Sequence, residues 1–144
     1  MKPNHASATA YLIAESTVLT RYSAELADFI PLRAAELSAR FTGPDSYLSR
    51  LRQNFRRSSF GRSVSSWMER RTVPGLQLHY ALRKRFLEET ARTAIADGVG
   101  QVVVLGAGFD TLALRLSEEF PALHFIEVDH PATQGQKLAR LDAA

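Results

Sequence analysis

The chain has 144 residues, 45% of them hydrophobic, which suits one globular domain with a buried core. Its 18 Lys and Arg against 15 Asp and Glu leave a net charge of +3, too small to indicate a nucleic-acid partner. The absence of cysteine excludes disulfides and thiolate metal sites and favours a reducing cytoplasm. The N-terminus does not resemble a signal peptide, and no run of about 18 apolar residues predicts a membrane span.

The first half of the chain predicts helices. Apolar residues recur at helical spacing over residues 8–30, where Pro31 marks a break, and again over residues 32–41. Residues 45–57 suit a basic helix. Residues 58–75 are rich in Ser, Arg and Gly, so we expect a mobile lid there, with an ordinary connecting loop as the alternative.

The clearest predicted helix covers residues 77–97. One of its faces is apolar and carries Leu82, Phe86, Leu87, Thr90, Ala91 and Ala94. The other face is polar and carries Lys84, Arg85, Glu88, Glu89 and Arg92. Arg83 falls within the apolar face, where a charge is costly unless an anion pairs with it. It is therefore a candidate for binding an anionic ligand, with a structural ion pair as the alternative, whereas Arg85 is expected to be solvated.

The second half of the chain predicts a βαβ unit. Residues 101–105 contain three consecutive valines, as expected for a parallel strand covered on both faces. A short helix over residues 110–119 leads to a second strand at residues 123–128, and residues 132–142 begin another helix. This order predicts an α/β, Rossmann-like fold with a parallel sheet.

A glycine turn, Gly106-Ala107-Gly108, follows the first predicted strand. Glycine lets the backbone turn sharply and approach a ligand, and the helix that follows directs its free N–H groups towards the same place. Asp129 ends the second strand 23 residues after Gly106, about the spacing at which a Rossmann-like unit presents a glycine loop and a ribose-binding carboxylate. These residues predict a site for an adenosine-type cofactor.

Asp110 decides which cofactor the sequence favours. A carboxylate at the start of the helix would repel the pyrophosphate of NAD but tolerate the sulfonium and ammonium groups of S-adenosylmethionine. The third glycine of the dinucleotide motif is also absent, because Thr111 stands in its place. The sequence therefore favours S-adenosylmethionine, although Asp110 also suits a helix N-cap and the two roles are compatible.

Asp129 is the residue best placed to accept hydrogen bonds from two ribose hydroxyls, the alternative being an aspartate that caps the loop before Pro131. His130 adjoins it and is a candidate contact to adenine or ribose. Glu127 shares a side of the strand with Asp129 and is expected to be a packing residue. The four histidines form no catalytic triad or metal-binding spacing, so we assign neither a catalytic base nor a metal site.

Three motifs together carry a resemblance: H-Y-A-L-R-K-R, V-V-x-L-G-A-G-x-D-T and E-V-D-x-P. The sequence resembles the leucine carboxyl methyltransferase family of class I S-adenosylmethionine-dependent O-methyltransferases, whose bacterial branch includes enzymes that methylate small molecules such as polyketides. The resemblance implies that Gly106 and Gly108 line the methionine and adenosine moieties, that Asp129 binds the ribose and that Arg83 pairs with the cofactor's carboxylate. It also implies an acceptor with a carboxylate or a hydroxyl group. The chain departs from many bacterial members at Leu112, where they have arginine.

The same resemblance implies the domain organisation. Residues 1–75 would form an N-terminal helical cap or lid, and residues 76–144 the N-terminal half of the cofactor-binding domain. A class I methyltransferase sheet has more strands than the two predicted here, so we expect the chain to be an N-terminal fragment with the first βαβ unit, the alternative being a short protein without catalysis.

Two other functions stay open: a fragment of an NAD-type Rossmann oxidoreductase, and a non-catalytic nucleotide-binding or interaction module. The second draws on eleven basic residues against three acidic ones between Arg50 and Arg92. The alternative explanation of that stretch, without any binding function, is a solvated arginine-rich surface. Because few aromatic residues interleave these arginines, nucleic acid is not an expected partner.

Overall fold

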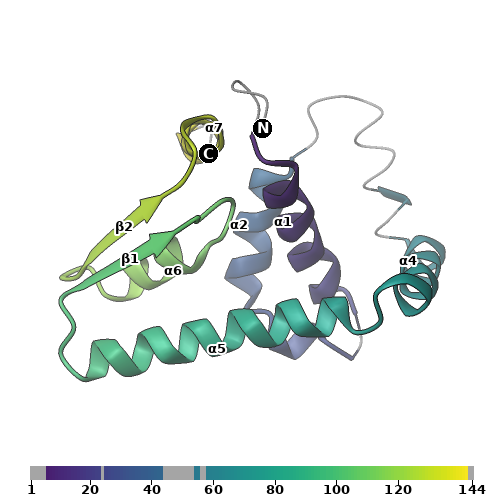
Figure 1. Ribbon diagram of the computed structural model, residues 1–144, viewed down its shortest axis with the longest axis horizontal. Coiled ribbons are helices and arrows are strands. Elements are labelled where there is room, and N and C mark those ends of the chain that lie inside the picture. Colours follow the sequence, from purple (N-terminus) through teal and green to yellow (C-terminus); the bar gives the residue numbers. More distant parts are fainter. Residues whose placement is uncertain (1–5, 24, 44–53, 56–57, 143–144) are drawn as a thin grey trace.

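The computed structural model describes residues 6–23, 25–43, 54–55 and 58–142 (Figure 1). In chain order its elements are helix α1 (Ala8–Arg21), the 3-10 turn η1 (Ala27–Phe29), helices α2 (Leu32–Phe41), α4 (Ser59–Thr72) and α5 (Leu76–Ala96), strand β1 (Gln101–Leu105), helix α6 (Leu112–Glu119), strand β2 (His124–Val128) and helix α7 (Pro131–Asp142).

The first helix is shorter than the sequence predicts. Helix α1 begins after Ser7, whose side chain accepts a hydrogen bond from a first-turn amide, and it ends at Arg21 instead of extending to residue 30. The Arg21 guanidinium donates to the carbonyl of Ala27 at 3.1 Å, which holds the chain in a turn after the helix. The prediction for residues 8–30 was therefore wrong beyond Arg21, whereas the helix predicted over 32–41 is α2.

Helix α4 occupies most of residues 58–75, so the connecting-loop alternative was wrong, whereas the lid role of this segment stays a prediction. Gly61 lies in the first turn, and its amide donates to the hydroxyl of Ser58 at 3.1 Å, as at a capped helix start. The Pro-Gly pair that follows lies beyond the last residue of α4, so it does not interrupt the helix. The basic helix predicted over 45–57 falls almost wholly outside the described residues, and residues 54–55 are helical.

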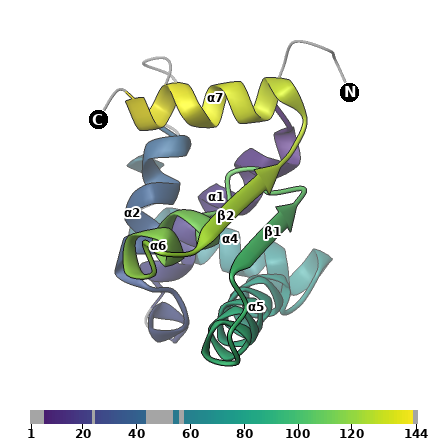
Figure 2. The ribbon, with the colours of Figure 1, turned by 90° about the vertical axis from the view of Figure 1, so that its left-hand side faces the viewer.

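Strands β1 and β2 pair in parallel, with Val103 opposite Ile126. Helix α6 connects them, which confirms the predicted βαβ unit and the α/β class. Figure 2 shows α6 beside the strands and α7 crossing beyond their C-terminal ends. The glycine loop and Asp129 therefore meet at the same edge of the sheet, where ligands of open α/β sheets bind.

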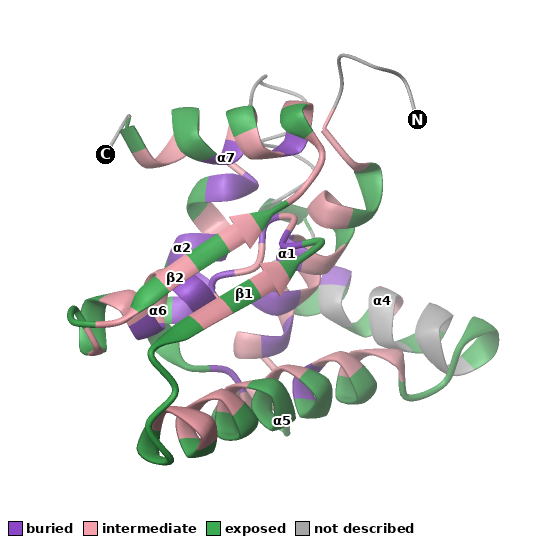
Figure 3. Ribbon diagram, turned by 60° about the vertical axis from the view of Figure 1, so that its left-hand side comes forward, coloured by how far each residue is buried: buried purple, intermediate pink, exposed green. Residues whose placement is uncertain are grey.

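One face of this sheet is open among the described residues. Helices α1, α2 and α6 lie behind it, and no described helix stands in front (Figure 3). The exposed fractions of the outward side chains are 50% for Val103, 77% for Leu105, 42% for Ile126 and 47% for Val128. The prediction that β1 is covered on both faces was wrong for this part of the chain.

The main apolar core lies where the glycine loop meets the first two helices. Phe109 is buried with Ala14, Leu37 and Phe41. Its ring stacks on Phe41 at 5.8 Å between centroids and meets Tyr11 edge-on at 4.8 Å. Burial of an aromatic side chain inside the loop anchors the loop to α1 and α2, so the helical segment contributes to the geometry of the site.

The face of α5 that the rest of the protein covers is not the one that the sequence predicts. Leu82, Phe86 and Leu87 are exposed, whereas Ala81 is buried. The predicted polar face turns towards α6 and forms three ion pairs, which we call the α5–α6 ladder: Lys84–Asp110 at 2.5 Å, Glu88–Arg115 at 2.7 Å and Arg92–Glu119 at 2.5 Å. The apolar-face prediction was wrong because the partners of α5 on α6 and the loop before it are charged.

Candidate functional site

The glycine loop turns back directly after β1. Gly106 and Gly108 both adopt a positive φ, 66° and 53°, which side chains disfavour. The amide of Gly106 donates to the carbonyl of Val128 at 2.7 Å and so closes the loop onto the end of β2. A Cβ at Gly108 would lie 3.3 Å from the Cβ of Ala10, so α1 approaches this glycine closely. The loop conformation thus requires glycine at both positions.

Asp129 connects β2 to this loop. Its Oδ2 accepts a hydrogen bond from the amide of Gly108 at 2.6 Å, and its Oδ1 accepts one from the amide of His130, also at 2.6 Å. The Nδ1 atom of His130 in turn accepts from the amide of Ala132 at 3.2 Å. These bonds fix the carboxylate at the edge of the sheet. Each carboxylate oxygen has two lone pairs, so the group still has acceptor capacity for a ligand hydroxyl.

Asp110 is held by an ion pair and by the start of α6. Its Oδ1 lies 2.5 Å from the ammonium of Lys84, and its Oδ2 accepts from the amide of Leu112 at 3.1 Å. Burial by itself raises the pKa of Asp110. The charge and hydrogen bond of Lys84 and the amides of Leu112 and Thr111 lower it by more, so the pKa lies below its usual value. The carboxylate therefore stays ionised at neutral pH.

This pairing changes the electrostatic argument from Asp110. The sequence interpretation treated the aspartate as an isolated negative charge at the helix start. With Lys84 at 2.5 Å, the two charges largely cancel, and the repulsion of a pyrophosphate is weaker than assumed. The N-cap of α6 is Thr111, so the assignment of Asp110 as the N-cap was wrong by one residue, although its Oδ2 does accept from the first amide of α6, that of Leu112.

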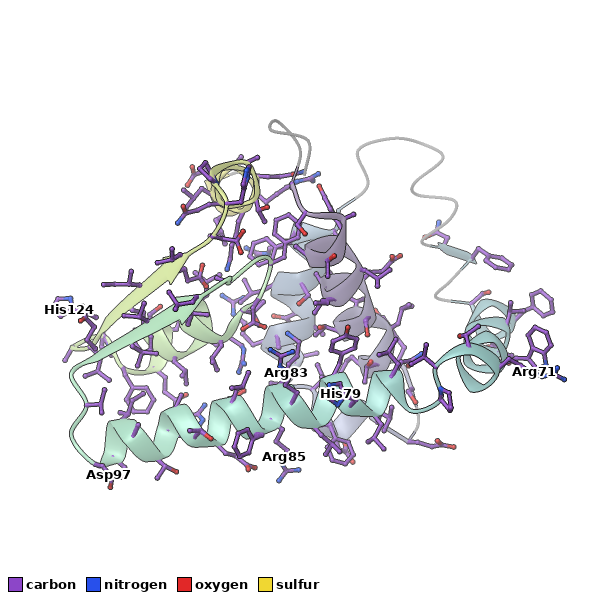
Figure 4. The ribbon with its side chains drawn as sticks, in the orientation of Figure 1. Arg71, His79, Arg83, Arg85, Asp97 and His124 are labelled. Carbon is purple, nitrogen blue, oxygen red and sulfur yellow. The ribbon has the colours of Figure 1, made fainter. Side chains whose placement is uncertain are left out.

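Arg83 leaves α5 on the side of the loop, whereas Arg85 leaves it on the opposite side (Figure 4). Arg83 forms no hydrogen bond or ion pair with any residue that the structure describes, so the structural ion pair considered as an alternative is not found there. Arg85 pairs with Glu89 at 2.8 Å and lies over the ring of Phe29 at 5.8 Å. The Arg85 side chain is 55% exposed, so the expectation that Arg85 is a surface residue is confirmed, with an exposed ion pair added.

One cavity of about 370 Å³ collects the candidate residues. It is lined by all seven that the sequence singles out: Arg83, Gly106, Ala107, Gly108, Asp110, Asp129 and His130. Arg85 also borders it. An apolar part of the wall comes from the N-terminal helical segment: Ile13, Phe29, Ile30, Pro31 and Ala34. A volume in this range is typical of small-molecule sites, which occupy roughly 300–1,000 Å³.

Sequence reasoning missed Lys84 and Lys137. Lys84 was assigned to the solvent face of its helix, and Lys137 was passed over, although its side chain is only 3% exposed. Its ammonium lies 2.6 Å from an oxygen of Glu127 and 2.6 Å from the carbonyl of Asp110. A signal was available, since Glu127 lies on the less exposed side of β2 and a partly buried charge there needs a partner.

The described residues contain no cluster of His, Asp and Glu that could hold a metal ion. Likewise, none of the helices in the described part of the chain combines the length and the apolar character that crossing a membrane requires.

Comparison with known proteins gives consistent matches. The sequence model of the leucine carboxyl methyltransferase family matches residues 30–144. A putative S-adenosyl-L-methionine-dependent methyltransferase, YktD of Bacillus subtilis, is 40% identical over 62 residues, which are 43% of this chain and 20% of that protein. Leucine carboxyl methyltransferase 1 of Caenorhabditis elegans is 34% identical over 87 residues, which are 58% of this chain and 26% of that protein. No solved structure matches the chain significantly.

Proposed function

The chain belongs to the leucine carboxyl methyltransferase family, and on that premise we propose that it forms the cofactor-binding part of an S-adenosylmethionine-dependent methyltransferase. The observation that carries the proposal is the shared cavity. The glycine loop, Asp129 and Arg83 come from three separate parts of the chain and line the same space. When bound, S-adenosylmethionine supplies an activated methyl group, and the protein supplies binding and orientation.

Each candidate residue has a chemical role in this proposal. Arg83 pairs with the carboxylate of the methionine moiety, because it is a cation at the cavity wall with no partner among the described residues. Asp129 accepts hydrogen bonds from the ribose hydroxyls, and His130 contacts adenine or ribose. The loop residues Gly106, Ala107 and Gly108 allow the ligand to approach the backbone.

The polar groups of the cavity suit a zwitterionic ligand. Arg83 offers a positive charge, while Asp110 offers a negative one that Lys84 already shares. A ligand ammonium near Asp110 and a ligand carboxylate near Arg83 would both meet opposite charges. Because Lys84 weakens the repulsion of phosphate, NAD remains the right competing ligand for a test.

For the acceptor, we propose a small molecule with a carboxylate or hydroxyl group, methylated in the cytoplasm. The apolar wall from Phe29, Ile30 and Ala34 favours an acceptor that carries an apolar group. A carboxylate acceptor needs no general base, which agrees with the lack of an assigned one. The segments matched in the two relatives cover 20% and 26% of their length, so the methyl transfer itself is proposed for the whole protein.

Calorimetric titration of the chain with S-adenosylhomocysteine tests the proposal, with NAD as the competing ligand. We expect binding of S-adenosylhomocysteine and none of NAD. Asp129→Asn should weaken binding, whereas Asp97→Asn, a matched change of an exposed carboxylate at the far end of α5, should not (Figure 4). Binding of NAD alone, or equal effects of the two variants, would contradict the assignment.

A further inference from the structure

Lys137 of α7 contacts Asp110, between the glycine loop and the start of α6. Its side chain is 3% exposed, and its ammonium donates to both carboxylate oxygens of Glu127, at 2.7 and 2.6 Å. The third donor goes to the backbone carbonyl of Asp110 at 2.6 Å. An ammonium has three N–H donors, so each of its hydrogen bonds is assigned within the protein.

The bond to the Asp110 carbonyl sets the orientation of a whole peptide group. The peptide is planar, so a carbonyl turned towards Lys137 turns the N–H of the next residue, Thr111, the other way. That N–H and the N–H of Leu112 both stabilise the ionised carboxylate of Asp110 by hydrogen bonding, and Asp110 lines the cavity. Lys137 is thus linked through one peptide plane to the carboxylate, although it does not line the cavity itself.

Stability alone does not account for this arrangement. A buried ion pair pays a large desolvation cost, and an apolar pair of similar volume is often as stable. Among the described residues, Lys137 is the cation that pairs with Glu127, whose side chain is 19% exposed. The feature that distinguishes Lys137 is that its third donor is used on the carbonyl of a cavity residue.

On the basis of the proposed cofactor site, we propose that Lys137 is a positioning residue. It fixes the peptide between Asp110 and Thr111 and thereby holds the Asp110 carboxylate and the first amides of α6 in the orientation that the ligand meets. Glu127 balances the charge of Lys137 and keeps its ammonium in place. Lys84 of α5 pairs with the carboxylate of the same aspartate, so Asp110 is contacted by one lysine at its side chain and by another at its backbone carbonyl.

The test variant is Lys137→Met combined with Glu127→Gln. Lys137→Met alone would leave a carboxylate without its cation and could prevent folding. The double change keeps the volumes and removes both charges. The control is Arg92→Met combined with Glu119→Gln, which removes a more exposed ion pair from the α5–α6 ladder, away from Asp110.

The first readout needs no ligand. In ¹H–¹⁵N spectra, we expect the Lys137/Glu127 variant to shift the amide signals of Thr111 and Leu112 and to raise their hydrogen-exchange rates by about tenfold. The control should leave these two signals in place. Unchanged signals in the Lys137/Glu127 variant, with only the melting temperature lowered, would overturn the proposal, because they would leave Lys137 a merely structural residue.

The second readout is the affinity for S-adenosylhomocysteine by calorimetry. We expect the Kd to rise by about tenfold in the Lys137/Glu127 variant and by less than about twofold in the control. An unchanged Kd in a folded variant would also overturn the positioning role. If the wild-type chain does not bind S-adenosylhomocysteine, the proposed function fails, and the amide signals alone then decide on Lys137.

Discussion

The amide of Gly108 donates to Oδ2 of Asp129 at 2.6 Å. This bond joins the two halves of the sequence pattern, the glycine turn after β1 and the acid at the end of β2. It exists because the parallel pairing brings the carboxyl ends of both strands to one edge of the sheet. The carboxylate proposed to bind ribose therefore also supports the loop that borders the ligand.

Asp129→Ala should weaken binding of S-adenosylhomocysteine by at least about tenfold, because it removes the ribose acceptor and the support of Gly108. Asp129→Asn keeps one carbonyl oxygen and should lose less. Calorimetric titration of both variants measures the difference. Equal affinity of Asp129→Ala and wild type would disprove the role of this residue.

Arg83→Ala should also lower the affinity, by roughly 10- to 100-fold, the range expected for one hydrogen-bonded ion pair. Arg85→Ala should change it by less than about threefold, since Arg85, although it borders the cavity, is already paired with Glu89 and leaves α5 on the side opposite to Arg83 (Figure 4). The same titration compares the two. Similar losses would show that the two arginines are not distinguished by their side of α5.

Gly108→Ala should destabilise the fold by about 1–2 kcal/mol, because a residue with a Cβ is strained at φ 53° and would crowd Ala10. Gly100→Ala is the matched control, since its Cβ would meet nothing within 4 Å. That change should be neutral or stabilise by about 0.4–1 kcal/mol. Urea denaturation measures both, and a stable Gly108→Ala variant would argue against the loop conformation.

Acid should destabilise the protein partly through Asp110. Its pKa is lowered in the folded state from the usual 3.8, so its stabilising contribution is present above that pH and is lost as the pH falls through the lower folded value. Asp110→Asn should therefore make the fall of unfolding free energy with acid shallower. Lys84→Met should act in the same direction, because it removes the cation that lowers this pKa. Wild-type acid dependence in both variants would contradict the pairing.

The open face of the sheet should promote self-association of the isolated chain, because four aliphatic side chains lie exposed there together. Val103→Lys combined with Ile126→Lys should reduce association in sedimentation velocity without loss of folding. Leu12→Lys combined with Leu32→Lys is the control, since both leucines are exposed away from the sheet. If the two double variants behave alike, the sheet face has no special part in association.

Several parts of the fold and the site could be predicted from the sequence, and each depends on local information. The glycine turn needs residues that accept a positive φ, and only glycines do so without strain. Strands β1 and β2 are short apolar runs bounded by turn residues, so their extent was predicted to within one residue. The seven candidate residues belong to the loop after β1, the end of β2 and helix α5. The sequence predicts the order of these elements, and all seven residues line one cavity.

The sequence by itself determined the βαβ unit, the glycine loop and the acid that faces it, since each follows from residues close together in the chain. Only the tertiary structure decided which face of α5 is covered, because helical periodicity groups Lys84 with Glu88 but cannot say that Asp110 and Arg115 stand opposite them. It also decided that Lys137 reaches the carbonyl of Asp110, since that contact joins residues 27 positions apart. Long-range pairing of charges depends on how helices and loops pack, which no local pattern encodes.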